Sequence, residues 1–381
     1  VDREIEIEKF QTEEYWTIAA DFKDENNNVM QANLSMLNDK KVEKFTFKNA
    51  DKTNITANEL EQKEYHVTSV TSQKRNRNPY APFTTSTMQQ EASKKLGFGA
   101  SRTMQVAQRL YQGFEINGET IGLITYMRTD STHLSSEALN ASKKFIESSF
   151  GNDFLSEKTN IYKNKVANAQ EAHEAIRPAG TAFKKVENIQ KIGVDEAKLY
   201  ELILNRTVAS QMKPAQYIRT NVEIHNGTSI FKTSGNVTVF KGYTLAYEQA
   251  LTRKDKGRPD SLPALDKQSK IQSKEVLLEE KTTSPPRRFS EAMLVKEMET
   301  RGIGRPSTYS AIIEKLSQKE YVVKKNKTLI PTFVGIAVSQ LLENHYNALF
   351  NERFTADMEN RLDAISTVSY THLTLPTICS V

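Results

Sequence analysis

Tyr126 and Arg128, in the run GLITYMRTDSTH at 122–133, are the residues best suited to do chemistry in this chain. In an extended segment, side chains two positions apart leave the same face, so we expect the phenol and the guanidinium to point at one spot. A tyrosine oxygen can form a covalent intermediate, but its ordinary pKa of about 10 demands a proton acceptor or a positive field. Arg128 offers charge and forked donors that suit phosphate oxygens. The pair indicates attack on a phosphate, although an isolated Tyr-x-Arg is more often a packed ring beside a surface cation.

The composition fits a soluble globular protein that can bind nucleic acid. The chain has 381 residues, of which 38% are hydrophobic and 26% charged, and a net charge of +5. This length predicts two or three domains. The small net charge permits nucleic-acid binding without requiring it, because a local basic face matters more than the total. Apolar runs are too short to span a membrane, and the charged start VDREIEIEKF is unlike a signal peptide.

The cysteine content indicates the cellular compartment of the protein. Cys379 is the only cysteine in the sequence. A disulfide within the chain and a Cys-based zinc ribbon are therefore excluded. A reducing, cytosolic compartment is the simplest fit.

Several segments resemble bacterial type IA DNA topoisomerases, enzymes that cut one DNA strand through a 5′-phosphotyrosine link and pass another strand through. The segments occur in the order of that family and together span most of residues 1–365. They are PFTTSTMQQEASKKLGFGASRTMQVAQRLYQG at 82–113, GLITYMRTDSTHLS at 122–135, QEAHEAIRP at 170–178, RFSEAMLVKEMETRGIGRPSTYSAIIEKL at 288–316 and FTADMENRLDAI at 354–365.

The resemblance implies a role for each residue of the site. Tyr126 attacks a DNA phosphodiester, Arg128 stabilises the charged phosphoryl group, and His173 positions a phosphate. Resealing reverses the attack by the released 3′-hydroxyl, so no ATP is implied. The predicted DNA-binding residues are Arg305, Ser307, Thr308, Arg177, Gln89 and Arg102.

His173 and Arg177 lie four positions apart, so they share a face if HEAIR forms the short helix that we expect. Pro178 biases Arg177 away from helical geometry. By itself the pair is more typical of a surface cap or of an ion pair with Glu171 or Glu174. Only the resemblance favours a DNA-contacting histidine.

The run RGIGRPST at 301–308 joins two predicted helices. Gly302 suits a left-handed helix stop, and Ser307 can cap the next helix. Free N–H groups at that helix start, beside Arg305, would suit a DNA phosphate. YVVKK and LIPT flank KNKT as a hairpin, so this module reads as helix-turn-helix with a basic wing. A plain helix connector is the alternative.

A second possible DNA surface lies on the helices expected at 87–96 and 101–112, which Thr87 or Ser86 and Ser101 can cap. Its cations could follow a single-stranded backbone, while Phe83 or Tyr111 could stack on bases. Such a charged run is more often a solvated face. The polar residues concerned are Thr85, Ser86, Gln89, Gln90, Lys94, Lys95, Arg102 and Arg109.

The order of patterns predicts an α+β, multidomain fold. YWTIAADF, QANLSML and EYHVTSVTS read as strands, as do QYIRTNVEIH, TSIFKTS and NVTVFKGY after a helical insert with long helices at 135–148 and 195–212. Two β blocks around an insert indicate a discontinuous domain. The resemblance agrees, because it implies part of a toroid in which a helical tyrosine domain interrupts a β arch and a winged-helix-like module forms the base.

This organisation gives provisional domain boundaries. Alternating Ile5 and Ile7 suggest a strand at the start, and 253–261 reads as a flexible linker. After RLDAIS the family pattern breaks. The expected parts are 1–14 as the end of the base, 15–82 plus 213–250 as the arch, 83–212 as the tyrosine domain, 251–368 as the helical base and 369–381 as a non-native tail.

We expect the chain to be a fragment. By resemblance, an acidic metal-binding (Toprim) domain with Mg²⁺ and a glutamate general acid/base precedes it, and a zinc-ribbon region follows it. We see no substitute acidic cluster in the sequence, so the Mg²⁺ ligands are expected outside this chain. The expected partner is the single-stranded segment of negatively supercoiled DNA, bound by a monomer at the bacterial nucleoid. By resemblance, the residues of GLITYMRTDS and GIGRPST favour an enzyme that relaxes DNA over one that decatenates it.

Two alternatives remain open at this point. A tyrosine recombinase also forms phosphotyrosine, but it carries His-x-x-Arg before a tyrosine near its C-terminus. Here Tyr126 comes first, and three residues separate His173 from Arg177. A non-catalytic module that binds single-stranded DNA is the second alternative for these residues.

Overall fold

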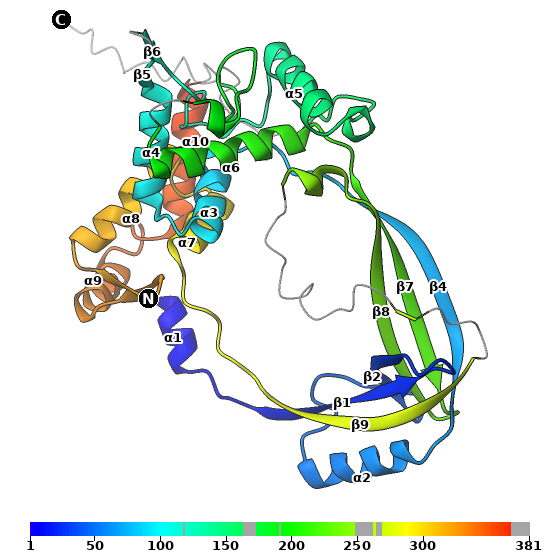
Figure 1. Ribbon diagram of the computed structural model, residues 1–381. Coiled ribbons are helices and arrows are strands. Elements are labelled where there is room, and N and C mark those ends of the chain that lie inside the picture. Colours follow the sequence, from blue (N-terminus) through cyan, green and yellow to red (C-terminus); the bar gives the residue numbers. More distant parts are fainter. Residues whose placement is uncertain (117–118, 163–172, 190–191, 248–261, 264–268, 367–381) are drawn as a thin grey trace, which may run out of the picture.

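The computed structural model describes residues 1–116, 119–162, 173–189, 192–247, 262–263 and 269–366. Its elements follow one another around a ring, with a long curved sheet on one side and groups of helices on the other (Figure 1). The expected linker at 253–261, the tail at 369–381 and Cys379 lie outside the described residues.

The sheet is antiparallel and contains strands from distant parts of the sequence. Its order is β1-β9-β4-β7-β8-β2-β3, and β1 also pairs with β2, so all of these strands except β3 close into a circuit. The predicted strands at both β blocks are confirmed, with TSIFKTS and NVTVFKGY merged into one long strand. The bounds are β1 Glu14–Lys23, β2 Val29–Leu37, β3 Lys40–Lys41, β4 Tyr65–Arg77, β7 Ala215–His225, β8 Ser229–Phe240 and β9 Lys270–Thr282.

Alternation of side chains along the strands places one apolar face inside this circuit. Phe22 of β1, Tyr65 of β4 and Phe231 of β8 are buried there. Their rings meet edge to face, with Phe22 5.0 Å from Tyr65 and 5.4 Å from Phe231 between centroids. This aromatic cluster holds the two β blocks together across the helical insert.

Two elements of the arch were not predicted. The helix α2 (Ala50–Glu61) lies in a stretch that we interpreted as strands only. Asn49 caps it by accepting a hydrogen bond from the Lys52 amide, and its buried residues Thr53, Ala57 and Leu60 follow a helical period. The strand β9 pairs with β1 and β4, so residues 270–282 belong to the sheet and not to the helical base.

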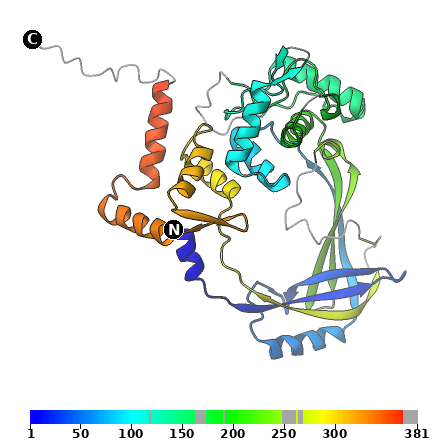
Figure 2. The same ribbon diagram turned by 60° about the vertical axis from the view of Figure 1, so that its left-hand side comes forward.

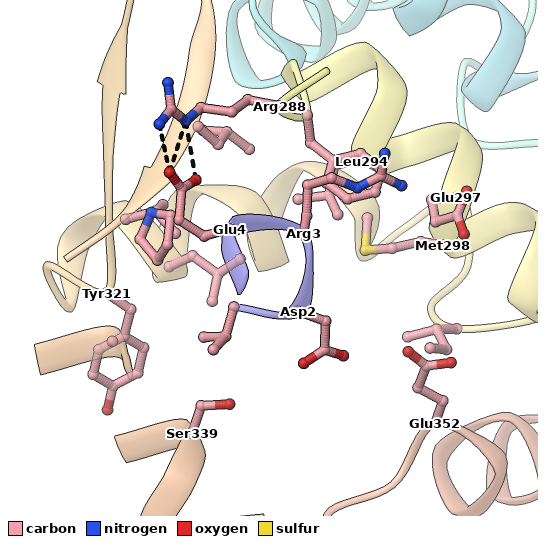
Figure 3. Close-up of a pocket in the computed structure, with 18 of the residues that line it drawn as sticks. Asp2, Arg3, Glu4, Arg288, Leu294, Glu297, Met298, Tyr321, Ser339 and Glu352 are labelled. Atoms are coloured by element: carbon pink, nitrogen blue, oxygen red, sulfur yellow. Dashed lines mark hydrogen bonds and ion pairs between the residues drawn. The ribbon is translucent and has the colours of Figure 1, made fainter. Parts of the chain in front are cut away.

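The start of the chain is also different from the prediction. Residues Asp2–Glu8 form the helix α1, and neither Ile5 nor Ile7 is buried, so their alternation does not reflect a sheet. Glu4 forms an ion pair with Arg288 beside a cavity of about 490 Å³ between α1 and the base (Figure 3). Arg3 lies 4.8 Å from the ring centre of Phe289. Charge contacts, more than apolar burial, hold this helix in place.

The helical insert contains the largest core of the molecule. Helix α6 crosses it, and its buried Leu199, Leu202 and Ile203 confirm the apolar stripe expected there. The insert also includes the small hairpin β5–β6. The bounds are α3 Thr85–Lys95, α4 Ala100–Gln112, β5 Phe114–Ile116, β6 Glu119–Ile121, α5 Ser136–Ser149 and α6 Val194–Ser210.

The predicted helix caps are wrong for α3 and α4, and no cap was predicted for α5. Ser135 caps α5 through the Ala138 amide. Thr84 caps α3 in a reciprocal box with Thr87, so α3 begins earlier than expected. Gly99 precedes α4, and this glycine has no side chain to act as a cap.

The base consists of α7 (Glu291–Arg301), α8 (Tyr309–Gln318), the hairpin β10 (Val322–Lys325) and β11 (Thr328–Pro331), α9 (Phe333–His345) and α10 (Glu352–Ser366). The hairpin around KNKT is confirmed. Gly302 ends α7 with a φ of 73°, as predicted, because glycine has no Cβ to strain in this conformation. Figure 2 shows α10 standing apart from the other helices of the base.

Helices of the insert and of the base meet and close the ring. Helix α3 packs on α7, and α4 packs on α8 (Figure 1). Ala100 shares a small buried cluster with Val295, Met298, Tyr309 and Ile313. This contact is much smaller than the core of the insert.

Candidate active site

Tyr126 and Arg128 lie in a loop beside α4, not in a sheet strand. The strand β6 ends at Ile121, and beyond it Ile124 makes only an isolated antiparallel bridge to Pro178. Exposure nevertheless alternates, because Met127 is buried while Tyr126, 37% exposed, and Arg128 face solvent. The predicted strand is therefore wrong, but both functional side chains are exposed at one stretch of the surface.

The ring of Tyr126 contacts two other rings. Tyr111, from the last turn of α4, meets it edge to face with centroids 5.4 Å apart and an interplanar angle of 67°. His173 meets it with centroids 5.6 Å apart and an angle of 42°. The structure thus brings His173 next to Tyr126 from a segment far along the chain.

The segment around His173 is extended and not helical, so the predicted HEAIR helix is wrong. Its amides serve neighbouring segments: that of Ala175 donates to the carbonyl of His133, and that of Ile176 to the carbonyl of Phe83, each at 2.8 Å. These bonds compete with the helical pattern. His173 and Arg177 therefore do not share a helical face. Gln170 and Glu171 lie outside the described residues.

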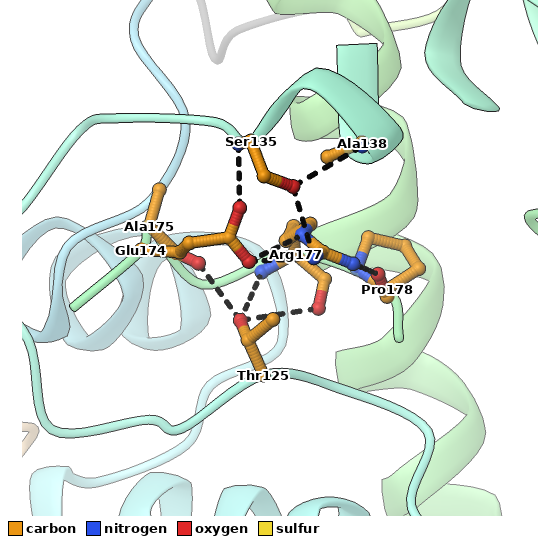
Figure 4. Close-up of polar contacts among 7 residues, drawn as sticks. All are labelled: Thr125, Ser135, Ala138, Glu174, Ala175, Arg177 and Pro178. Atoms are coloured by element: carbon orange, nitrogen blue, oxygen red, sulfur yellow. Dashed lines mark hydrogen bonds and ion pairs between the residues drawn. The ribbon is translucent and has the colours of Figure 1, made fainter. Parts of the chain in front are cut away.

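Arg177 is buried, with 7% of its surface exposed. Its Nη2 donates to Glu174 Oε2 at 2.5 Å and to Ser135 Oγ at 3.4 Å, and its Nη1 donates to the Pro178 carbonyl at 2.9 Å (Figure 4). A guanidinium engaged in this way is not presented to DNA. The structure contradicts the predicted DNA contact at Arg177, because burial in this network satisfies its donors internally.

The same network anchors the tyrosine loop. Thr125, which precedes Tyr126, donates to the Ala175 carbonyl at 2.7 Å, and the Arg177 amide donates to Thr125 Oγ1 at 3.0 Å. Burial would raise the pKa of Glu174, but hydrogen bonds from Ser135 and Arg177 outweigh it and lower that pKa. Glu174 is therefore held as a carboxylate, which keeps its ion pair and the loop in place.

Asp130 is a residue of the site that the sequence reasoning missed. Burial raises the pKa of its carboxyl, with a further rise from the charge of Asp363, while Arg305 and His173 act in the opposite direction. It lines a small cavity of about 70 Å³ between the insert and the base, together with Thr84, Ser86, Thr129, Glu299, Gly302, Gly304, Arg305, Pro306, Tyr309 and Asn360. In the sequence, only its position four residues after Tyr126 could have indicated that Asp130 lies near the site.

Arg305 supports the turn before α8. Its Nη2 donates to Asp363 Oδ2 at 2.7 Å, and its Nη1 donates to the Gly304 carbonyl at 2.8 Å. Its amide donates to Thr308 Oγ1 at 2.8 Å. Thr308, not Ser307, precedes α8, so the predicted cap is wrong, because the Thr308 hydroxyl stabilises the turn instead. Ser307 is exposed.

The remaining predicted contacts, Gln89 and Arg102, lie on α3 and α4. Gln89 is 1% exposed, and its amide atoms have no hydrogen-bond partner among the described residues. Arg102 donates from Nε to Asp195 at 2.9 Å and lies 4.5 Å from the ring centre of Phe98. This ion pair is typical of a solvated charged face on α4, whereas Thr85 and Ser86 of α3 are buried and not presented to DNA.

The described residues do not fit a magnesium site. Among them, no group of three or more His, Cys, Asp or Glu side chains is placed to hold a metal ion. We therefore assign no metal ligand in this part of the chain. In the same part, no helix is long and apolar enough to cross a membrane.

The model of a DNA topoisomerase family matches residues 1–375. The chain belongs to this DNA topoisomerase family. DNA topoisomerase 1 of Rickettsia prowazekii (strain Madrid E) is 41% identical over 367 residues, which cover 96% of this chain and 47% of the relative. That of Campylobacter jejuni subsp. jejuni (serotype O:2) is 40% identical, with 96% and 51% covered. The topoisomerase chain spans about half the length of the curated relatives it matches.

A solved structure agrees with this topoisomerase fold. Full-length topoisomerase I from Thermotoga maritima superposes with a TM-score of 0.81 at 34% identity, over 97% of this chain and 58% of that one. The α+β, type IA topoisomerase-like fold expected from the sequence is thereby confirmed.

Proposed function

We propose that this chain carries the strand-cleaving tyrosine of a type IA DNA topoisomerase, which relaxes negatively supercoiled DNA without ATP. The observation that carries the proposal is the exposed Tyr126, whose ring contacts Tyr111 and His173, with Arg128 two positions further along the chain. Relatives named DNA topoisomerase 1 support the class of reaction.

In the proposed reaction, the Tyr126 oxygen forms a bond to the phosphorus of a DNA phosphodiester. The bond to the 3′-oxygen breaks, that oxygen leaves with a proton as a 3′-hydroxyl, and the phenol gives up its own proton. Arg128 stabilises the charge on the phosphoryl oxygens, and His173 positions one of them. Resealing is the reverse transfer, so the phosphate bond energy is conserved and no ATP is consumed.

The proposed substrate is the single-stranded segment of a negatively supercoiled duplex, bound by a monomer at the nucleoid in the cytoplasm. Ser307 and Thr308, at the start of α8, remain proposed DNA contacts, as does Arg305 if a phosphate displaces one of its internal bonds. Gln89 and Arg102 are weaker proposals, since one is buried and the other ion-paired. Mg²⁺ is proposed for a full-length enzyme, with ligands outside the described residues.

We also propose a division of the chain into structural parts. Residues 15–82 and 213–250, joined by β9, form the arch, and residues 83–212 form the tyrosine-bearing part. The base comprises 1–14 and the helices from α7 onward. Separation of the base from the tyrosine-bearing part, which meet at α3–α7 and α4–α8, would admit a strand.

A covalent-trapping experiment tests the function. The chain is incubated with an end-labelled single-stranded oligonucleotide and denatured, and the products are separated by size. We expect a protein–DNA adduct with wild type and none with Tyr126→Phe, which keeps the ring and loses the nucleophile. Salt-sensitive binding without any adduct would instead support the alternative, a non-catalytic module for single-stranded DNA.

A further inference from the structure

Tyr111 is an exposed aromatic residue that the proposed reaction does not use. It lies in the last turn of α4, and 41% of its surface is exposed although its ring packs against that of Tyr126. Phe83, the other ring that the sequence offered for stacking, is fully buried, with 0% exposed. Of these two candidates, only Tyr111 can meet a ligand.

The backbone fixes Tyr111 in this place. The amide of Leu123, at the start of the tyrosine loop, donates to the carbonyl of Leu110 at 2.8 Å. Gly113 ends α4 at a φ of +95°, and a Cβ there would collide with the Ile121 carbonyl. A Cβ on Gly122 would lie 2.6 Å from the Tyr111 carbonyl. The end of α4 and the loop therefore pack backbone to backbone, and Tyr111 and Tyr126 keep their mutual position.

The cations of α4 are already engaged. Arg109 pairs with Glu196 at 2.5 Å, and Arg102 pairs with Asp195. Because both arginines of α4 are ion-paired, the helix presents the exposed ring of Tyr111, and not an unpaired cation, to the proposed DNA segment. Base–aromatic stacking is tolerant of sequence, because every base has a π face.

We propose that Tyr111 stacks on a base next to the phosphate that Tyr126 attacks. This inference rests on the proposed function, since it needs single-stranded DNA at Tyr126. Tyr111 acts as a rigid platform that holds the neighbouring nucleotide and so places the phosphate against the phenol. The stacked base contributes affinity that does not depend on neutralising phosphate charge.

A thermodynamic cycle tests the proposal. Affinity for a fluorescein-labelled oligothymidylate is measured by anisotropy, with wild type and with Tyr111→Ala, at 50 and 200 mM salt. We expect Tyr111→Ala to weaken binding about 5-fold or more, by a similar factor at both salt concentrations. Tyr111→Phe and Tyr111→Trp keep the affinity, and Tyr111→Leu, which keeps bulk without a π face, loses it. Tyr346→Ala, at an exposed tyrosine after α9, is the matched control and changes nothing.

The second change in the thermodynamic cycle is made in the DNA: a single abasic site is placed at each position of the oligonucleotide in turn, and the affinity is measured. We expect one position at which the abasic site weakens wild type and has no further effect on Tyr111→Ala. Independent losses at every position would overturn stacking, as would unchanged affinity of Tyr111→Ala or retention by Tyr111→Leu. If wild type neither binds the oligonucleotide nor forms an adduct, the proposed function itself fails. Wild-type binding with an unaffected Tyr111→Ala removes only this inference.

Discussion

Glu291 Oε2 accepts a hydrogen bond from the Ala100 amide at 2.7 Å, between residues 191 positions apart. Ala100 is the first residue of α4, and Gly99 before it has no side chain to cap the helix. Glu291 opens α7, so the base supplies the missing cap to the tyrosine-bearing insert. Its other oxygen accepts from Lys324 Nζ of the hairpin at 2.7 Å. One carboxylate therefore joins elements of both parts where the ring closes.

We expect Glu291→Ala to weaken this closure. A lost cap typically lowers the free energy of unfolding by about 1 kcal/mol, and the positive end of the α4 dipole strengthens the effect of a carboxylate. Urea denaturation measures the change. Glu297→Ala, in an exposed pair with Arg301, serves as the control and should have a smaller effect. Equal losses in both variants would contradict a special role for Glu291.

Arg177→Ala should be strongly destabilising. It leaves Glu174 without its main partner and removes bonds to Ser135 and Pro178 in a buried network. We expect a loss of about 2–3 kcal/mol in the free energy of unfolding, read from urea melts. Arg102→Ala breaks an exposed pair and should cost below about 1 kcal/mol. A DNA-binding role without a structural one would instead leave the melt of Arg177→Ala unchanged.

Asp130→Asn should stabilise the fold in a pH-dependent way. Because the pKa of Asp130 is raised in the folded state, stability falls as pH rises from the ordinary value, about 4, through the folded pKa, and stays lower above it. The neutral amide avoids this penalty. We expect a gain over wild type at pH 7 and none at pH 3, measured by urea denaturation. Asp153→Asn, in the exposed part of the 3-10 helix Asn152–Phe154, is the control, and an equal gain at both pH values would refute the assignment.

We expect the 381-residue chain alone to leave negatively supercoiled plasmid unrelaxed, even with Mg²⁺. General acid–base catalysis is worth about 10²–10⁴-fold, and a metal ion adds charge neutralisation. The resemblance assigns the general acid/base and the metal ligands to residues outside the part of the chain that the structure describes. Agarose gels with a full-length relative as positive control give the answer. Relaxation by the purified chain, absent in Tyr126→Phe, would show that these residues suffice.

The sequence predicted the exposure of Tyr126 and Arg128 more accurately than the segments that hold them in place. The exposed pair of Tyr126 and Arg128 follows from local alternation, which survives without a strand. Glu174 and Arg177 were misplaced because their segment bonds to distant amides and carbonyls, and tertiary partners then override helical propensity. Helix α1 was missed because its apolar residues match a strand period while charge contacts hold the helix. Asp130 was missed because its carboxyl acquires its environment only when insert and base meet.

The closed circuit of strands has a mechanical consequence. Among the described strands, β1, β9, β4, β7, β8 and β2 each have neighbours on both sides over part of their length. Where a strand is paired on both sides, it resists being peeled off alone, because two ladders must break together. Beyond His66, β4 pairs with β7 alone. Load applied between insert and base would then travel along β4, β7 and β8 as elastic bending. A separation of insert and base would therefore have to be accommodated by bending of the arch.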